Sequence, residues 1–304
     1  MCKMYADSFW GGDLSSCAGY EALVKRNSDS KKMCQDLEEY LKKRSKLEAD
    51  YSKSLQGLAK CFRQRQEVGV LEKAINRFRD EIEAVAQCHS NAAAVFHQQS
   101  DTIRRFKENQ TLQRKALEEQ LHKSQSSKLS QLSKTLQLEK IYVRKFTDRD
   151  AAEQNFKEMT TQQVPPKEIE KARNKVTKAE EEAKKADTAY RSAVKTLESC
   201  RVSWEKEMIS TCQSIQDLDE KRIAFLRQEL WLAANINSTL ALDIDNSSES
   251  VREVLEDCDV QSDIDAFLLV AQTGQAHPEP FMFRHYTKLV GCREDTESNP
   301  YNTI

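Results

Sequence analysis

The sequence is poor in the two residues that most often turn a chain. Only 7 of its 304 residues are glycine and 5 are proline, well below their usual share in globular proteins. No glycine occurs between Gly69 and Gly274, and no proline between Pro166 and Pro278. Because β and α/β folds need frequent turns, these gaps exclude most such folds and predict a few very long helices.

Aromatic residues and long apolar runs are also scarce. Aromatic side chains make up 7% of the chain, and its mean hydropathy is −0.74. Helices of this composition bury their apolar seams against each other or against a second chain. The sequence contains no apolar run of about 18 residues, the length that a membrane-spanning helix needs, and no apolar N-terminal run typical of a signal peptide.

The cysteines and histidines form no catalytic or metal-binding pattern. Nine cysteines are scattered along the chain without a CxxC pair, and the five histidines do not cluster with them. An odd number of dispersed thiols predicts reduced cysteines in the cytosol. Since no nucleophile–base set, phosphate loop or metal spacing occurs either, we expect no catalytic residue, no metal and no cofactor. The chain is not predicted to be an enzyme.

The spacing of apolar residues predicts helices over about residues 15–24, 30–63, 70–162, 166–245 and 248–271. Beyond residue 275 the periodicity ends, and residues 276–304 are predicted to form an extended, partly disordered tail. At a rise of 1.5 Å per residue the two longest helices would be about 140 and 120 Å long, too long for a compact monomer. We expect an all-α fold, an elongated antiparallel helical bundle of three long helices with short terminal helices, completed by a second copy.

Charge is unevenly distributed along a chain whose net charge is only −2. Residues 25–65 contain 12 basic and 6 acidic side chains, and residues 104–149 contain 12 and 5. Residues 205–265 contain 5 basic and 15 acidic side chains. Blocks of like charge are typical of interaction surfaces, and two basic helices packed together would make one long positive surface.

A stripe of lysines follows one side of the first long helix. At about 100° per residue, four lysines fall within roughly 40° of one another: Lys42, Lys46, Lys53 and Lys60. The opposite side carries an apolar set that we interpret as a buried seam: Tyr40, Leu47, Tyr51, Leu55 and Leu58. The lysine stripe indicates a surface for a negative partner, with an ordinary solvated face as the alternative.

Two negative partners are to be weighed. Nucleic acid is disfavoured because the basic stripes lack interleaved aromatic residues, the isoelectric point is about 6.3, and no nucleic-acid-binding motif occurs. An anionic membrane is favoured, since each lysine or arginine near such a surface contributes on the order of 1 kcal/mol and a dimer doubles their number.

Residues 9–60, from "FWGGDLSSCAGYEALVKR" to "YLKKRSKLEADYSKSLQGLAK", resemble the opening of the F-BAR family. There an aromatic segment precedes a basic helix of the type C-x-D-L-E-E-x-L-x-x-R-x-x-[IL]-E-x-x-Y-x-K-x-L. Further likeness lies in "QRK", "KFTDRDAAEQNF", "EKARNK" and "DIDAFLLVAQTGQAHPEP". The resemblance covers most of the chain and implies an F-BAR domain over residues 1–275. The segment "RQELWLAANI" is similar to the proline–serine–threonine phosphatase interacting branch, in a form without an SH3 domain.

The resemblance implies a crescent-shaped homodimer whose basic concave face binds and curves membrane rich in phosphoinositide and phosphatidylserine. It implies an adaptor on the cytosolic face of the plasma membrane, linked to the actin cytoskeleton and to a PEST-type protein tyrosine phosphatase. The family's membrane-binding positions correspond to Lys42, Lys60, Arg65, Arg114, Lys115, Lys123 and Lys167. A coiled-coil cytoskeletal adaptor that binds only proteins, and no membrane, is the alternative.

Three further residues are candidates for partner binding or regulation. The resemblance implies that the phosphatase docks near Trp231, although an aromatic residue that packs within the bundle would give the same pattern. Tyr286 and Tyr301 fit loose tyrosine motifs of the sorting or phosphorylation kind. Such motifs often arise by chance.

Overall fold

The computed structural model describes residues 4–62, 67–162 and 164–286. Every regular element in these ranges is a helix. The long helices are α2 (Ala18–Ala59), α3 (Gly69–Thr161) and α4 (Pro166–Glu256). The structure also has three short elements: α1 (Tyr5–Ser8), the 3₁₀ helix η1 (Lys60–Phe62) and α5 (Val260–Ala271). The expected fold class, an elongated antiparallel helical bundle, is confirmed.

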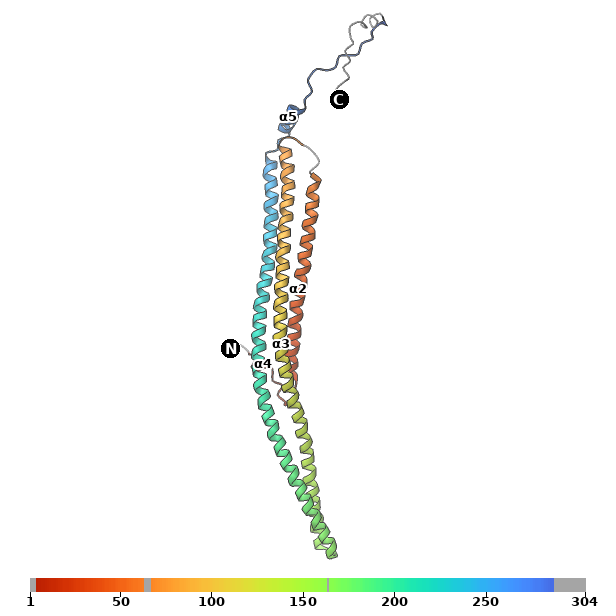
Figure 1. The fold of residues 1–304 in the computed structure, drawn as a ribbon, viewed down its shortest axis with the longest axis vertical. Helices are drawn as coiled ribbons and strands as arrows, with labels where there is room; N and C mark the ends of the chain where they lie inside the picture. Colours follow the sequence, from red (N-terminus) through yellow and green to blue (C-terminus); the bar gives the residue numbers. More distant parts are fainter. Residues whose placement is uncertain (1–3, 63–66, 163, 287–304) are drawn as a thin grey trace.

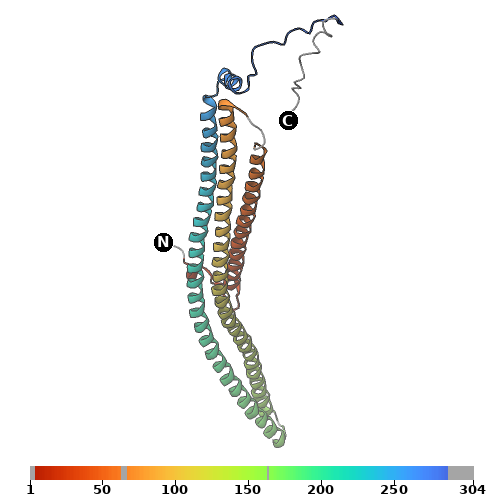
Figure 2. The ribbon, with the colours of Figure 1, turned by 45° about the horizontal axis from the view of Figure 1, so that its top comes forward.

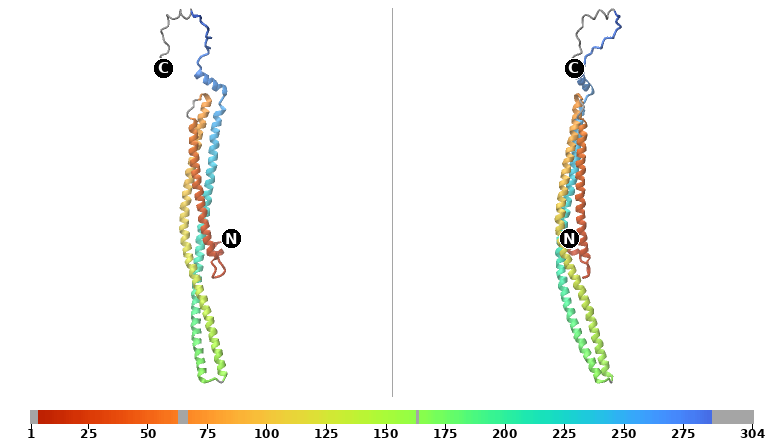
Figure 3. Two further views of the ribbon diagram at one scale, coloured as in Figure 1. Left: turned by 90° about the vertical axis from the view of Figure 1, so that its right-hand side faces the viewer. Right: turned by 45° about the vertical axis from the view of Figure 1, so that its right-hand side comes forward.

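The molecule is a curved rod (Figures 1 and 2). Helices α2, α3 and α4 lie side by side along one half, and beyond the start of α2 the other two continue as a bent pair. The chain reverses between α3 and α4 at the sequence Pro165–Pro166, with a proline in the first turn of α4, where its missing N–H costs nothing. The N-terminal segment lies against the middle of α4, and α5 lies beyond the ends of α3 and α4 (Figure 3).

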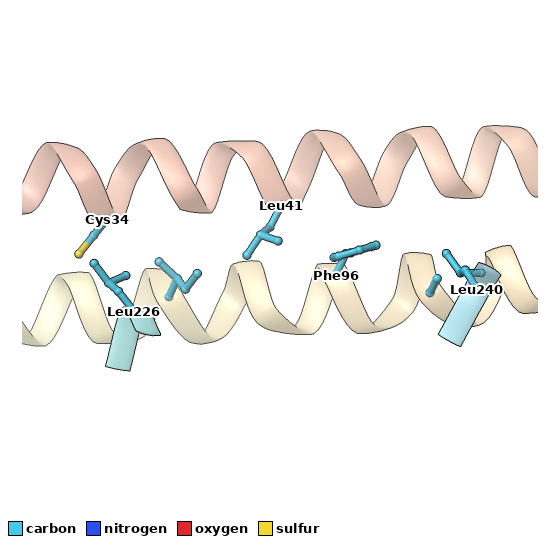
Figure 4. Close-up of a cluster of buried hydrophobic side chains, with 7 residues drawn as sticks. Cys34, Leu41, Phe96, Leu226 and Leu240 are labelled. Carbon is cyan, nitrogen blue, oxygen red and sulfur yellow. The ribbon is translucent and has the colours of Figure 1, made fainter. Parts of the chain in front are cut away.

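The three-helix half is built around one apolar cluster. Leu41 of α2, Phe96 and Ile103 of α3 are at most 1% exposed. Leu226 and Leu240 of α4 complete the cluster from the third side (Figure 4). Because all three long helices contribute, the core fixes their mutual orientation, and it decides which side of each helix is left for other contacts.

The N-terminal segment closes this half of the bundle where α2 begins. Tyr5 and Phe9 pack on a second cluster that includes Leu23, Met208 and Ile215. A Cβ atom at Gly19 would lie 1.8 Å from the Phe9 carbonyl oxygen. Only glycine therefore lets the segment lie directly on α2.

Two helix boundaries differ from those expected. The break expected between residues 24 and 30 does not occur, because Asn27 and Ser30 are buried and their side chains bond to Glu118 of α3 and Asp219 of α4. The break expected near residue 246 is also absent. There Ser247 bonds to the carbonyl of Glu81 on α3, and α4 continues to Glu256. In both places side-chain hydrogen bonds to other helices compensate for weak helix formers.

Helix α5 is attached to the start of α3 through its polar side. The Asp263 carboxylate accepts the backbone N–H groups of Val70 and Leu71 at 2.6 and 2.8 Å. These bonds hold the pKa of Asp263 below its usual value. Gly69 has φ +74°, and its missing side chain leaves the space that Asp263 occupies. The apolar side chains of α5 remain largely exposed, for instance Leu269 at 79%.

Candidate functional site

Helix α2 presents three different sides along its length. Its buried side carries Cys34, Leu41, Glu48, Ser52 and Ala59. Measured from Leu41 at 100° per residue, the lysine stripe lies about 100–140° to one side. Met33, Tyr40, Leu47, Tyr51 and Leu58 lie about 80–120° to the other, and all five are more than half exposed. The helix therefore separates a basic side from an apolar side.

The basic side adjoins α3. Lys42, Lys46, Lys53 and Lys60 are all exposed. Lys31 of α2 and Lys115 of α3 line one cleft of about 270 Å³ between these helices, which places Lys115 on the same face. Lys123 is exposed further along α3, and Lys167 is exposed at the turn between α3 and α4. Arg65 lies outside the described residues.

Arg114 does not belong to this basic face, contrary to the expectation from the sequence. Its side chain is only 5% exposed and points into the bundle between all three long helices. It donates to Asp219 of α4 at 2.6 Å and to Asn27 of α2 at 2.5 Å. A guanidinium held by buried partners cannot reach a lipid headgroup, so Arg114 is a structural residue.

Asp219 is the centre of a buried polar network. It accepts hydrogen bonds from Arg26 at 2.6 Å, Arg114 at 2.6 Å and the Tyr5 hydroxyl at 2.9 Å. Arg222 and Ser30 also donate to it. Burial by itself would raise the pKa of Asp219, but the donors from Arg114, Arg26 and Tyr5 outweigh it and hold this pKa far below the usual range. One carboxylate thus ties α2, α3, α4 and the N-terminal segment together.

No local signal in the sequence distinguishes Asp219 from its neighbours. Asp217, two residues earlier, is exposed and belongs to the same acidic stretch. Only the packing of three helices reveals which of the two is buried.

The apolar side of α2 corrects a second expectation. Its side chains were expected to form the buried seam, yet Leu47 is 66% exposed within the protomer. The surface continues onto α4, where Asp219 and Asn237 contact α2. Ile223 and Leu230, each more than half exposed, lie within about 40° of that line of contact. The α2–α4 face is thus an apolar surface that no described residue of a single copy covers.

Trp231 stands at the border of this apolar face. It is 69% exposed and lines an open groove of about 540 Å³ with Ile223, Leu226 and Leu230. Trp231 is therefore not packed within the bundle of a single protomer.

Other kinds of site do not appear in the part of the chain that the structure describes. Among those residues no group of three or more His, Cys, Asp or Glu side chains could hold a metal ion. None of the described helices is both long and apolar enough to cross a bilayer.

Comparison with known proteins identifies the family. Residues 19–91 match the family described as "Fes/CIP4, and EFC/F-BAR homology domain". The chain is 34% identical to mouse proline-serine-threonine phosphatase-interacting protein 1, over 94% of this chain and 70% of that protein. The human protein of that name is 33% identical, over 93% of this chain and 68% of its own length. The chain belongs to the F-BAR family.

Solved structures of F-BAR domains share its fold. The Imp2 F-BAR domain superimposes with a TM-score of 0.82 at 25% identity, covering 95% of this chain and 94% of that one. The Hof1p F-BAR domain superimposes with a TM-score of 0.78 at 18% identity, covering 91% and 100%. The long helices of this F-BAR chain and their bend are thus features of a known architecture.

The Asp219 network predicts a specific loss of stability. Replacing Asp219 by Asn removes the acid that Arg114 and Arg222 share, and takes the carboxylate partner away from these buried cations. We expect the free energy of unfolding to fall by about 3–5 kcal/mol at neutral pH, measured by urea unfolding at fixed protomer concentration. The matched change Asp217→Asn, at an exposed position of the same helix, should alter it by less than about 0.5 kcal/mol.

The same network fixes the pH dependence of that loss. Because the folded-state pKa of Asp219 lies below the unfolded value of 3.8, its contribution is complete above that pH and declines as the pH falls further. The difference in the free energy of unfolding between the wild type and Asp219→Asn should therefore become smaller in acid. A gap that stays constant from pH 7 to about pH 3, or an equal effect of Asp217→Asn, would contradict the assignment.

Proposed function

We propose that this F-BAR chain is a dimeric scaffold that binds and curves anionic membrane. The observation that carries the proposal is the arrangement on α2, where exposed lysines and exposed apolar side chains occupy opposite sides of the same buried seam. The apolar side suits a second protein copy, and the basic side suits negative headgroups. One helix can thus serve both contacts at once.

The dimer is inferred from the size and chemistry of the α2–α4 face. Apolar side chains follow α2 from Met33 to Leu58 and recur on α4 at Ile223 and Leu230. Contiguous apolar surfaces of this extent mark contact sites in soluble proteins. A two-fold pair of identical faces would cover both at once and would bring two lysine stripes into one assembly.

The membrane contact is inferred to be electrostatic. Lys42, Lys46, Lys53, Lys60 and Lys115 carry it, and Lys123 and Lys167 extend it towards the tip. Such cations attract phosphatidylserine and phosphoinositide headgroups, each contributing on the order of 1 kcal/mol, and a dimer adds them over one curved surface. We propose that the protein acts peripherally on the cytosolic face of the plasma membrane, as a link to the actin cytoskeleton.

A phosphatase is the proposed protein partner. The names of the mouse and human relatives describe them as interacting with a proline-serine-threonine phosphatase. We assign a PEST-type tyrosine phosphatase to Trp231 itself, at the border of the apolar face that the dimer covers, because an exposed tryptophan is a typical binding hot spot. Tyr286, 68% exposed, remains a proposed phosphorylation site. Tyr301 lies outside the described residues.

Charge reversal on α2 tests the membrane contact. Lys46→Glu with Lys53→Glu should weaken co-sedimentation with phosphatidylserine vesicles at least about tenfold, because both contacts turn repulsive in both copies. The control pair Lys73→Glu and Lys221→Glu makes the same change in charge at exposed positions on the α3–α4 side, and should change binding less than about twofold. An equal loss of vesicle binding in both double variants would contradict the proposal that the membrane binds to the lysine side of α2. A wild-type chain without vesicle affinity would favour the protein-only adaptor.

Truncation of Trp231 tests the partner site. Trp231→Ala should reduce capture of a PEST-type phosphatase C-terminal peptide at least about tenfold, as loss of a hot-spot aromatic does, while vesicle binding stays unchanged. The control Leu112→Ala removes an equally exposed apolar side chain, 71% exposed, from the outer side of α3. Undiminished capture by Trp231→Ala would overturn the assignment.

A further inference from the structure

A groove lies on the third side of the bundle, between α3 and α4. It has a volume of about 320 Å³. Ala92 and Leu240 of the core form its floor, and Val95, Leu232 and Ile236 form its walls. Neither the lysine side of α2 nor its apolar side contributes a residue. The groove therefore stays accessible when the proposed membrane and dimer contacts are both made.

The groove is acidic at one end. Asp243 lies there beside Cys88, and burial together with this carboxylate raises the pKa of the Cys88 thiol. From Asp243 onward, residues 243–259 contain seven acidic side chains and one basic. An anionic lipid is therefore repelled from this end, and an apolar segment with a positive charge fits it.

The chain itself contains such a segment. After α5 it runs away from the bundle (Figures 1 and 3), and Phe281, Met282 and Phe283 are 99%, 73% and 92% exposed. Arg284 follows directly, and residues 281–293 include no aspartate or glutamate. Three adjacent large apolar side chains left in water favour burial wherever a matching groove is within reach.

The groove is within reach. Helix α5 sits on the ends of the two helices that line it, held by Asp263 at the start of α3. Nine residues, 272–280, separate Ala271 from Phe281, so these two residues can lie up to about 35 Å apart when the segment is extended. Leu240, the core residue near which Phe281 would dock, lies 16 residues before the end of α4 at Glu256, about 24 Å along the helix.

We propose that residues 281–284 dock into the α3–α4 groove of their own copy. Phe281 and Phe283 occupy the apolar part near Leu240, and Arg284 pairs with Asp243. Docking brings Tyr286 next to the acidic stretch of α4. A phosphate on Tyr286 would add negative charge there and oppose docking, which would couple tail modification to the exposure of this groove.

Cys88 reports on docking without any added label. A maleimide reaches Cys88 only when the groove is open, whereas Cys61 is exposed on η1 and does not line the groove. In the full chain, Phe281→Ser with Phe283→Ser should raise the alkylation rate of Cys88 at least about threefold and leave that of Cys61 unchanged. Peptide mass spectrometry at fixed pH measures both rates.

A matched control separates docking from a general change in polarity. Val260→Ser with Leu269→Ser replaces two apolar side chains of α5 that are 75% and 79% exposed, and should change neither rate. An unchanged Cys88 rate in the phenylalanine variant overturns the proposal. So does an equal rise in the control. Because the readout needs neither lipid nor phosphatase, its failure is distinct from failure of the proposed function.

A second measurement identifies which copy supplies the segment. Phe283→Cys, at a position that docking places inside the groove near Cys88, should form a disulfide with Cys88 when oxidised glutathione is the oxidant. In a mixture of isotope-labelled and unlabelled chains, each linked pair should then consist of two labelled peptides or of two unlabelled peptides. Mixed pairs would show that a second copy's segment fills the groove, and would overturn docking within one copy.

Discussion

The structure depends on how α2 meets its two neighbours. Its 42 residues contact α3 and α4 through one narrow seam, where Leu41 and Cys34 pack against Phe96 and Leu226. Once that seam is fixed, the remaining sides of α2 point in set directions. The lysines then face outward beside α3, and the exposed tyrosines and leucines face outward beside α4. The proposed membrane and dimer contacts both depend on this one packing arrangement.

The polar network around Asp219 fixes the position at which the bundle changes from three helices to two. A buried carboxylate with arginine donors contributes little by itself, since desolvation offsets much of its attraction, but it tolerates no other register. Tyr5 also donates to Asp219 and to Gln216, so the beginning of the N-terminal segment lies on α4, near the start of α2. The bent pair of α3 and α4 begins there (Figure 2).

Much of this fold could be predicted from the sequence, because long stretches without glycine or proline leave a chain few alternatives to long helices. The turn at Pro165–Pro166 and the seams of α3 and α4 follow from local rules. The lysine stripe was also recognisable, because its residues share one side of a single helix. What failed were assignments that depend on neighbours. Arg114 looks like Lys115 in the sequence, yet only the partners across the bundle make one buried and the other exposed.

The apolar side of α2 is a second case in which the sequence alone does not tell which side chains one protomer buries, here with apolar residues that are exposed. A periodic apolar stripe predicts burial but not the partner that provides it. In one protomer, Tyr40 and Leu47 are half to two-thirds exposed, so their burial needs another surface. The helix boundaries near residues 27 and 247 failed for a related reason, since hydrogen bonds to other helices stabilise polar residues that locally favour a break.

The mass of the protein in solution tests the central claim most directly. Sedimentation equilibrium of the wild-type chain should give twice the protomer mass of 35.0 kDa. Leu47→Asp, on the apolar side of α2, should give the single mass, and Leu112→Asp, equally exposed on α3, should keep the double mass. A wild-type protein that sediments as one copy, or a Leu47→Asp variant that remains a dimer, would contradict the account.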